Sequence, residues 1–196
     1  MISSSSKKTG KKEFFKIDIP FTTAKIFVLA RSIEELNNKN AKIDLTRYMR
    51  GKNLEMKVKI KVQGEKIKSE PISLYLTTSY VKKIVRRGTD YVEDSFELNC
   101  RDRKTIIKPL LVTRNKVSRA VRNSLRKATK KYIENHCKNI TALEVVSEIL
   151  SNKLQKALSL KLKKIYPLAL CDIRVFDIKE ETKSKEPEIK ESPSQE

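Results

Sequence analysis

The sequence predicts a single α+β domain between two disordered tails. Three observations support this prediction. Apolar residues alternate with polar ones in much of the first two thirds of the chain, they recur at helical spacing in the final third, and the two ends hold few of them. We therefore expect residues 13–179 to fold and residues 1–12 and 180–196 to be disordered. A length of 196 residues without an internal repeat fits one domain of ordinary size.

Strands are predicted by apolar residues at every second position. The alternation is clearest from Leu54 to Val62, where lysines occupy the polar positions. A turn over residues 63–66 leads into a second alternating run through Ile72, Leu74 and Leu76, so a hairpin is expected. Further strands are expected over residues 15–19, 25–30, 42–48, 91–100, 105–113 and 170–178.

Proline adds a prediction about one of these strands. Pro109 lies within the run 105–113, and proline has no N–H to donate to a neighbouring strand. We therefore expect this strand to lie at a sheet edge or to contain a β-bulge.

Helices are predicted from apolar residues three and four positions apart. A short helix is expected over residues 79–87, which Gly88 ends, and a longer one begins near Val117. Thr141 and Glu144 have the spacing of a capping box that opens the next helix. A last helical stretch runs over residues 154–165.

The charge of the chain indicates a polyanionic partner. Lys and Arg number 44 against 24 Asp and Glu, a net charge of +20, and the segment 180–196 is itself acidic with six Glu and three Lys. The remainder of the chain therefore carries +23. Like charges at this density repel one another, and phosphates relieve the repulsion. RNA or DNA is thus favoured over a small acidic substrate.

The candidate RNA-binding residues come from two basic stretches. Between Arg101 and Lys131 the chain has twelve basic residues and one acid, Asp102, so intrahelical ion pairs cannot balance the charge. The second stretch, residues 82–87, has a simpler alternative, because cations are favoured near any helix C-terminus. A solvated basic face remains the alternative for both. The candidates are Lys82, Lys83, Arg86, Arg87, Arg101, Arg103, Lys104, Arg114, Lys116, Arg119, Arg122 and Arg126.

Patterns typical of catalysis, cofactors and membranes are missing from the sequence. His136 is the only histidine, the four glycines are isolated, and the three cysteines have no Cys-x-x-Cys spacing. No run approaches the ~18 apolar residues of a membrane span. We expect a soluble, intracellular protein that is not an enzyme and that has no metal, no cofactor and no membrane partner.

Aromatic residues are sparse along the sequence. There is no Trp, and the six Phe and six Tyr do not form the closely spaced pairs with which an RNA-recognition strand stacks bases. Contacts to the backbone and shape of structured RNA, within a large assembly, are therefore expected.

Five motifs resemble one known family. They are Lys11-Lys12-Glu13-Phe14-Phe15-Lys16-Ile17, Tyr80-Val81-Lys82-Lys83-Ile84-Val85-Arg86-Arg87, Thr113-Arg114-Asn115-Lys116, Ile165-Tyr166-Pro167-Leu168 and Asp172-Ile173-Arg174-Val175. In order and spacing they are similar to motifs of the small-subunit ribosomal protein S3Ae family (S1e type) of archaea and eukaryotes. The resemblance covers roughly residues 11–179.

The resemblance implies a more specific fold and function. The fold would be an antiparallel β-barrel-like sheet with three or four appended helices. The protein would be a structural constituent of the small ribosomal subunit, with rRNA, neighbouring ribosomal proteins and mRNA near the exit as partners. It would lie on the platform in cytoplasmic ribosomes, assembled in the nucleolus in a eukaryote. Two alternatives stay open: a free-standing basic nucleic-acid-binding protein of RNA processing or chromatin, and an RNA-modifying enzyme.

Overall fold

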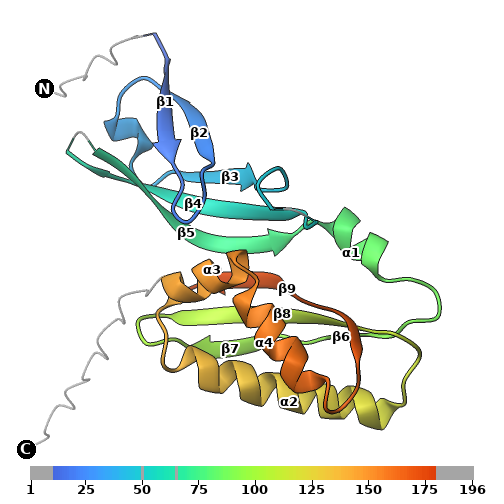
Figure 1. The fold of residues 1–196 in the computed structure, drawn as a ribbon. Helices are drawn as coiled ribbons and strands as arrows, with labels where there is room; N and C mark the ends of the chain where they lie inside the picture. The colour runs from blue at the N-terminus through green and yellow to red at the C-terminus, as the bar shows by residue number, and fades with distance from the viewer. Residues whose placement is uncertain (1–10, 50, 65, 180–196) are drawn as a thin grey trace, which may run out of the picture.

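The computed structural model has an α+β fold in which all strand pairs are antiparallel (Figure 1). It describes residues 11–49, 51–64 and 66–179, so residues 1–10 of the tail predicted at 1–12, and the whole tail predicted at 180–196, lie outside the described residues. The strands are β1 (Glu13–Asp18), β2 (Lys25–Ala30), β3 (Asn40–Asp44), β4 (Leu54–Gln63), β5 (Lys66–Leu76), β6 (Tyr91–Glu93), β7 (Phe96–Asn99), β8 (Lys104–Thr113) and β9 (Leu168–Ile178).

The strands form two sheets. β1 and β2 pair with each other, and the other strands form one sheet in the order β3-β4-β5-β9-β8-β6, with β7 also paired to β8. The predicted antiparallel α+β architecture is thus confirmed. Within the described residues β3 does not pair with β6 or β7, so the sheet is open and not closed into a barrel.

The last strand joins the two halves of the large sheet. β9 pairs with β8 along most of its length, and it pairs with β5 only through Ser73–Tyr75 opposite Val175–Asp177. The hairpin β4–β5 and the strands β6–β8 therefore form one sheet through a strand that comes from the far end of the sequence (Figure 1).

Pro109 lies in the centre of the sheet. β8 has β9 on one side and β6 and β7 on the other, so the predicted edge position is wrong. The alternative prediction, a β-bulge, is confirmed, because the register of β8 against β9 shifts between Lys108 and Pro109. The shift leaves Arg174 of β9 without a partner residue, and its side chain forms an ion pair with Glu93 of β6.

Four α-helices and one short 3₁₀ helix lie within the described residues. α1 ends before Arg86 and so is shorter than predicted, whereas Thr141 and Glu144 form the predicted capping box of α3. The helices are η1 (Glu34–Leu36), α1 (Thr78–Ile84), α2 (Arg119–Cys137), α3 (Ala142–Leu150) and α4 (Lys153–Leu162).

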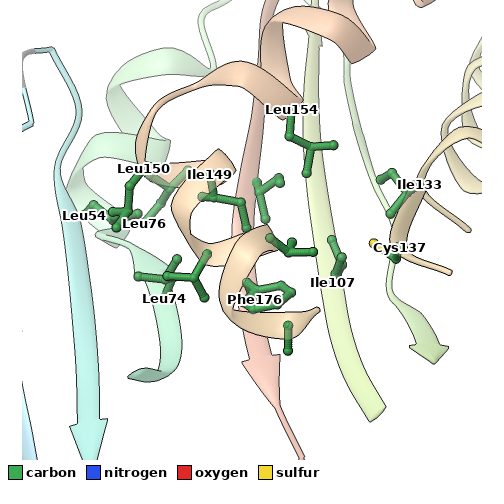
Figure 2. Packing of buried hydrophobic residues seen from close by; sticks show 14 of the residues in the cluster. Leu54, Leu74, Leu76, Ile107, Ile133, Cys137, Ile149, Leu150, Leu154 and Phe176 are labelled. Carbon is green, nitrogen blue, oxygen red and sulfur yellow. The ribbon is translucent and has the colours of Figure 1, made fainter. Parts of the chain in front are cut away.

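The main core lies between the sheet and the helices α2, α3 and α4 (Figure 2). Phe176 of β9 and Ile107 of β8 are fully buried, and Leu74 of β5, Ile149 of α3 and Ile133 of α2 belong to the same cluster. Burial of such side chains contributes about 1.5–3 kcal/mol each. Because this packing fixes the inner face of α2, it also fixes which side chains of α2 face the solvent.

Candidate nucleic-acid interface

The long helix α2 presents arginines to the solvent because its other face is buried. Leu125, Ile133 and Cys137 are buried at spacings of four and eight residues, which is the stripe of one helix face. Arg119 and Arg126 lie on the remaining surface and are exposed. These two arginines of the predicted basic stretch therefore lie on the solvent-exposed face of a helix whose other face is packed in the core.

Hydrogen bonds around Asp90 fix the start of α2. Asp90 Oδ2 accepts a 2.9 Å bond from the backbone N–H of Val117, and the backbone O of Asp90 accepts one of 2.8 Å from the hydroxyl of Thr113. The backbone N–H of Asp90 donates back to that hydroxyl over 3.0 Å. These bonds, which we call the Asp90 knot, hold the segment 86–90 beside the segment 113–117.

The knot brings together candidates from two parts of the sequence. Arg86 and Arg87 precede Asp90 closely, and Arg114, Lys116 and Arg119 follow Thr113 closely. All five are exposed, and we call them the α2-start cluster. The sequence analysis took these five residues from two separate basic stretches, and in the structure they lie at one end of the molecule.

Three candidates lie at the other end of strand β8. Arg101 and Arg103 belong to the turn between β7 and β8 and Lys104 is the first residue of β8; we call these three residues the β7–β8 cluster. The ten residues of β8 span about 30 Å at ~3.3 Å per residue. The candidates from Arg101 to Arg126 therefore do not form one continuous patch (Figure 1).

The remaining candidates lie on helices near the first cluster. Lys82 and Lys83 are exposed in the last turn of α1. Arg122 of α2 is half-buried, and among the described residues its Nε has no hydrogen-bond partner. A buried donor without an acceptor is costly.

Two candidates have carboxylate partners. Arg103 lies 2.6 Å from an oxygen of Glu70, and Arg126 lies 4.0 Å from Asp94. Within residues 11–49, 51–64 and 66–179, no ion pair involves the other candidates, namely Lys82, Lys83, Arg86, Arg87, Arg101, Lys104, Arg114, Lys116, Arg119 and Arg122. Their charge is therefore available to an external anion.

Glu70 reduces the positive charge available at the β7–β8 cluster. Burial raises the pKa of Glu70, but hydrogen bonds from Lys61 and Arg103 lower this pKa by more than burial raises it. The pKa of Glu70 is therefore held below the usual 4.5. The carboxylate is thus charged at neutral pH and neutralises part of these two cations. The β7–β8 cluster is consequently the weaker of the two for binding an anion.

The groups considered for catalysis have structural roles. His136 Nε2 lies 2.6 Å from Glu148 Oε2, and its ring stacks on Tyr132 with centroids 5.9 Å apart. The cysteines are unpaired thiols, and no group of three or more His, Cys, Asp or Glu within the described residues could hold a metal ion. In the same residues no helix is long and apolar enough to cross a membrane.

The structure adds features that the sequence did not indicate. Phe14 of β1 and Phe27 of β2 are exposed on the same outer face, because Phe14 is opposite Leu29 and Lys16 is opposite Phe27. The absence of close aromatic pairs in the sequence was thus a poor guide. Lys161 of α4, outside both predicted basic stretches, lies 4.4 Å from the ring centroid of Tyr132.

Comparison with known proteins identifies the family. The chain is 29% identical over 117 residues to the small ribosomal subunit protein eS1 of Nanoarchaeum equitans, and the match covers 59% of each chain. It is 31% identical to that of Methanothermobacter thermautotrophicus, over 57% of this chain and 58% of the relative. To that of Haloarcula marismortui it is 26% identical, over 75% of this chain and 68% of the relative. The chain thus spans less than two thirds of the first two relatives.

The match to a whole family is more extensive than these pairwise matches. The sequence model of the Ribosomal S3Ae family matches residues 4–181, which include every described strand and helix. The chain therefore belongs to the ribosomal S3Ae family.

Proposed function

We propose that this chain is a structural constituent of the small ribosomal subunit that binds rRNA through the α2-start cluster and the β7–β8 cluster. The observation that carries the proposal is the set of exposed cations that have no carboxylate partner in the described residues. Family membership and the name of the archaeal relatives support the ribosomal role. The family is one of ribosomal proteins and not of enzymes, in agreement with the sequence.

The arrangement of the cations suits folded RNA. Arginine can hold a phosphate through two parallel hydrogen bonds, and the α2-start cluster has three arginines within the two segments joined by the Asp90 knot and a fourth, Arg119, at the start of α2. The β7–β8 cluster lies about 30 Å away, at ~3.3 Å per residue of β8. We infer that the two clusters contact separate segments of rRNA backbone, which anchors the protein in a defined orientation.

The proposal extends to the platform of the subunit, near the mRNA exit, and to mRNA and neighbouring ribosomal proteins as partners. Exposed apolar side chains on the outer face of β1–β2, Phe14, Phe27 and Leu29, favour a protein contact there. The protein would act in cytoplasmic ribosomes, with nucleolar assembly if the host is a eukaryote.

Sedimentation of a tagged copy on a sucrose gradient tests the ribosomal role. We expect the chain in the small-subunit fraction, with partial retention after a moderate salt wash, because many phosphate contacts must be lost together. Recovery away from ribosomes in a soluble pool would contradict the proposal. It would favour the alternative of a free-standing nucleic-acid-binding protein.

A further inference from the structure

A pocket between α2 and α4 lies outside both cationic clusters. Its volume is about 520 Å³, within the range of roughly 300–1,000 Å³ that small-molecule sites occupy. Leu158 and Leu162 of α4, both almost fully buried, lie beneath the pocket, and Tyr132 of α2 provides an aromatic ring. Lys131 and Asn135 of α2 and Lys161 of α4 provide the polar groups. Among the residues that the structure describes, no Asp or Glu lines the pocket.

The two lysines make the pocket attractive to an anion. Both are exposed, and in the described part of the chain neither forms an ion pair. The ammonium of Lys161 lies instead over the ring of Tyr132, 4.4 Å from its centroid. A cation over an aromatic ring is worth only about 0.5–1 kcal/mol at an exposed site. A phosphate can therefore attract this ammonium away from the ring.

The ring of Tyr132 is held in place by its neighbours. It stacks on His136 at an interplanar angle of 13°, and His136 is held in turn by the 2.6 Å contact with Glu148 of α3. Burial, with the nearby charge of Glu148, raises the pKa of the Tyr132 phenol. The ring therefore stays neutral and offers a fixed aromatic surface beside the two leucines.

We propose that this α2–α4 pocket receives one unpaired nucleotide of the bound RNA. The phosphate lies between Lys131 and Lys161, and the base lies against Tyr132 and the apolar surface. The amide of Asn135, which has both a donor and an acceptor, contacts the edge of the base. The inference rests on the proposed rRNA binding and adds to it a site for an unstacked base.

The chemistry of the pocket favours a nucleotide over an acidic protein segment. A carboxylate would pair with the lysines but would leave the aromatic and apolar surface uncovered, whereas a nucleotide joins an anion to a flat ring. Proteins read RNA mainly at loops and bulges, where unpaired bases reach aromatic side chains. A fully paired helix cannot place a base in this pocket.

The test uses the full chain, a fully paired RNA hairpin and versions of that hairpin that differ from it only by one bulged nucleotide. Binding is measured for each of the four bulged bases and for the paired hairpin. We expect wild type to prefer at least one bulged hairpin, and Lys161→Gln to lower that affinity by about tenfold, in the range of one lost hydrogen bond to a charged group. The matched control is Lys156→Gln, which removes an exposed lysine of the same helix that does not line the pocket. On the paired hairpin both variants should lose affinity equally.

Two variants of Tyr132 separate the ring from the hydroxyl. Tyr132→Leu should abolish the preference for the bulge, and Tyr132→Phe should retain it. Thermal unfolding of both variants shows whether the fold is intact. If Tyr132→Leu is unfolded, the comparison of Lys161→Gln with Lys156→Gln decides the result.

The possible outcomes distinguish this inference from the proposed function. If wild type binds bulged and paired hairpins equally, or if Lys161→Gln and Lys156→Gln behave alike on both, the pocket proposal is overturned while RNA binding stands. If wild type binds neither hairpin, the proposed function itself fails. If Lys161→Gln weakens binding of a poly-glutamate peptide and leaves both RNA affinities unchanged, the occupant is an acidic protein segment.

Discussion

The backbone N–H of Val117 donates a 2.9 Å hydrogen bond to Asp90 Oδ2, although the two residues are 27 positions apart. This bond and the bonds between Asp90 and Thr113 fix the point where α2 begins. An acidic side chain thus holds together the most cationic end of the molecule. Its role is to position the α2-start cluster.

Replacement of Asp90 separates its charge from its structural role. Asp90→Ala leaves the N–H of Val117 without its acceptor, and we expect a loss of about 1–3 kcal/mol in the free energy of unfolding. Simple electrostatics predicts tighter RNA binding after loss of an acid, whereas loss of the hydrogen bond to the N–H of Val117 predicts weaker binding. We expect weaker binding in a filter-binding assay. The control is Asp94→Ala, which frees Arg126 and should bind RNA slightly more tightly.

The salt dependence of binding reports the number of phosphate contacts. Changing Arg114, Lys116 and Arg119 to Gln together should reduce the slope of log affinity against log salt by about 0.7–0.9 for each lost contact. Lys42→Gln is the control, because Lys42 lies 2.5 Å from Glu55 and its charge is already balanced. An unchanged slope in the triple variant would show that these residues do not contact phosphate.

Glu70→Gln tests whether a carboxylate weakens the β7–β8 cluster. The variant releases Lys61 and Arg103, so RNA affinity at neutral pH should increase. The pKa of Glu70 is lower in the folded protein than its usual 4.5, so ionised Glu70 stabilises the fold above about pH 4.5, and this contribution is lost as the pH falls through the lowered pKa. Chemical unfolding across this range should show a smaller loss of stability on acidification in Glu70→Gln than in wild type.

Two leucines on neighbouring helices test the core beneath the basic surface. Leu125 of α2 is fully buried, whereas Leu160 of α4 is 69% exposed. Leu125→Ala should cost about 2–5 kcal/mol of the free energy of unfolding, and Leu160→Ala should cost less than about 0.5 kcal/mol. Equal effects of the two substitutions in urea unfolding would contradict the orientation of these helices.

Local signals in the sequence were sufficient for most elements of the fold. Thr141 and Glu144 lie three residues apart in one turn, so their capping box depends on no distant contact. The alternating pattern from Leu54 to Val62 predicted the bounds of β4 to within one residue. In β5 the register skips Ile72, because Ser73 faces Lys57 and Pro71 faces Val58. Ile72 therefore does not continue the inward pattern, and such a bulge depends on the partner strand.

The parts of the site that depend on distant contacts could not be predicted. The structural role of Asp90 could not be inferred from the sequence, because its partner, Val117, is set by tertiary structure. Phe14 and Phe27 are 13 positions apart and meet on one face only through strand pairing. The basic stretch from Arg101 to Lys131 was one feature in sequence, but the ten residues of β8 separate Arg101 and Arg103 from Arg114 and Arg119.

Cross-linking of rRNA to protein in assembled small subunits, followed by mass spectrometry of the cross-linked peptides, is the most direct test of the rRNA interface. We predict rRNA cross-links in peptides that contain residues 82–87 and 114–122, and fewer at residues 101–104, where Glu70 competes for Arg103. Subunits that contain the protein but whose cross-links to rRNA fall outside these segments would contradict the account.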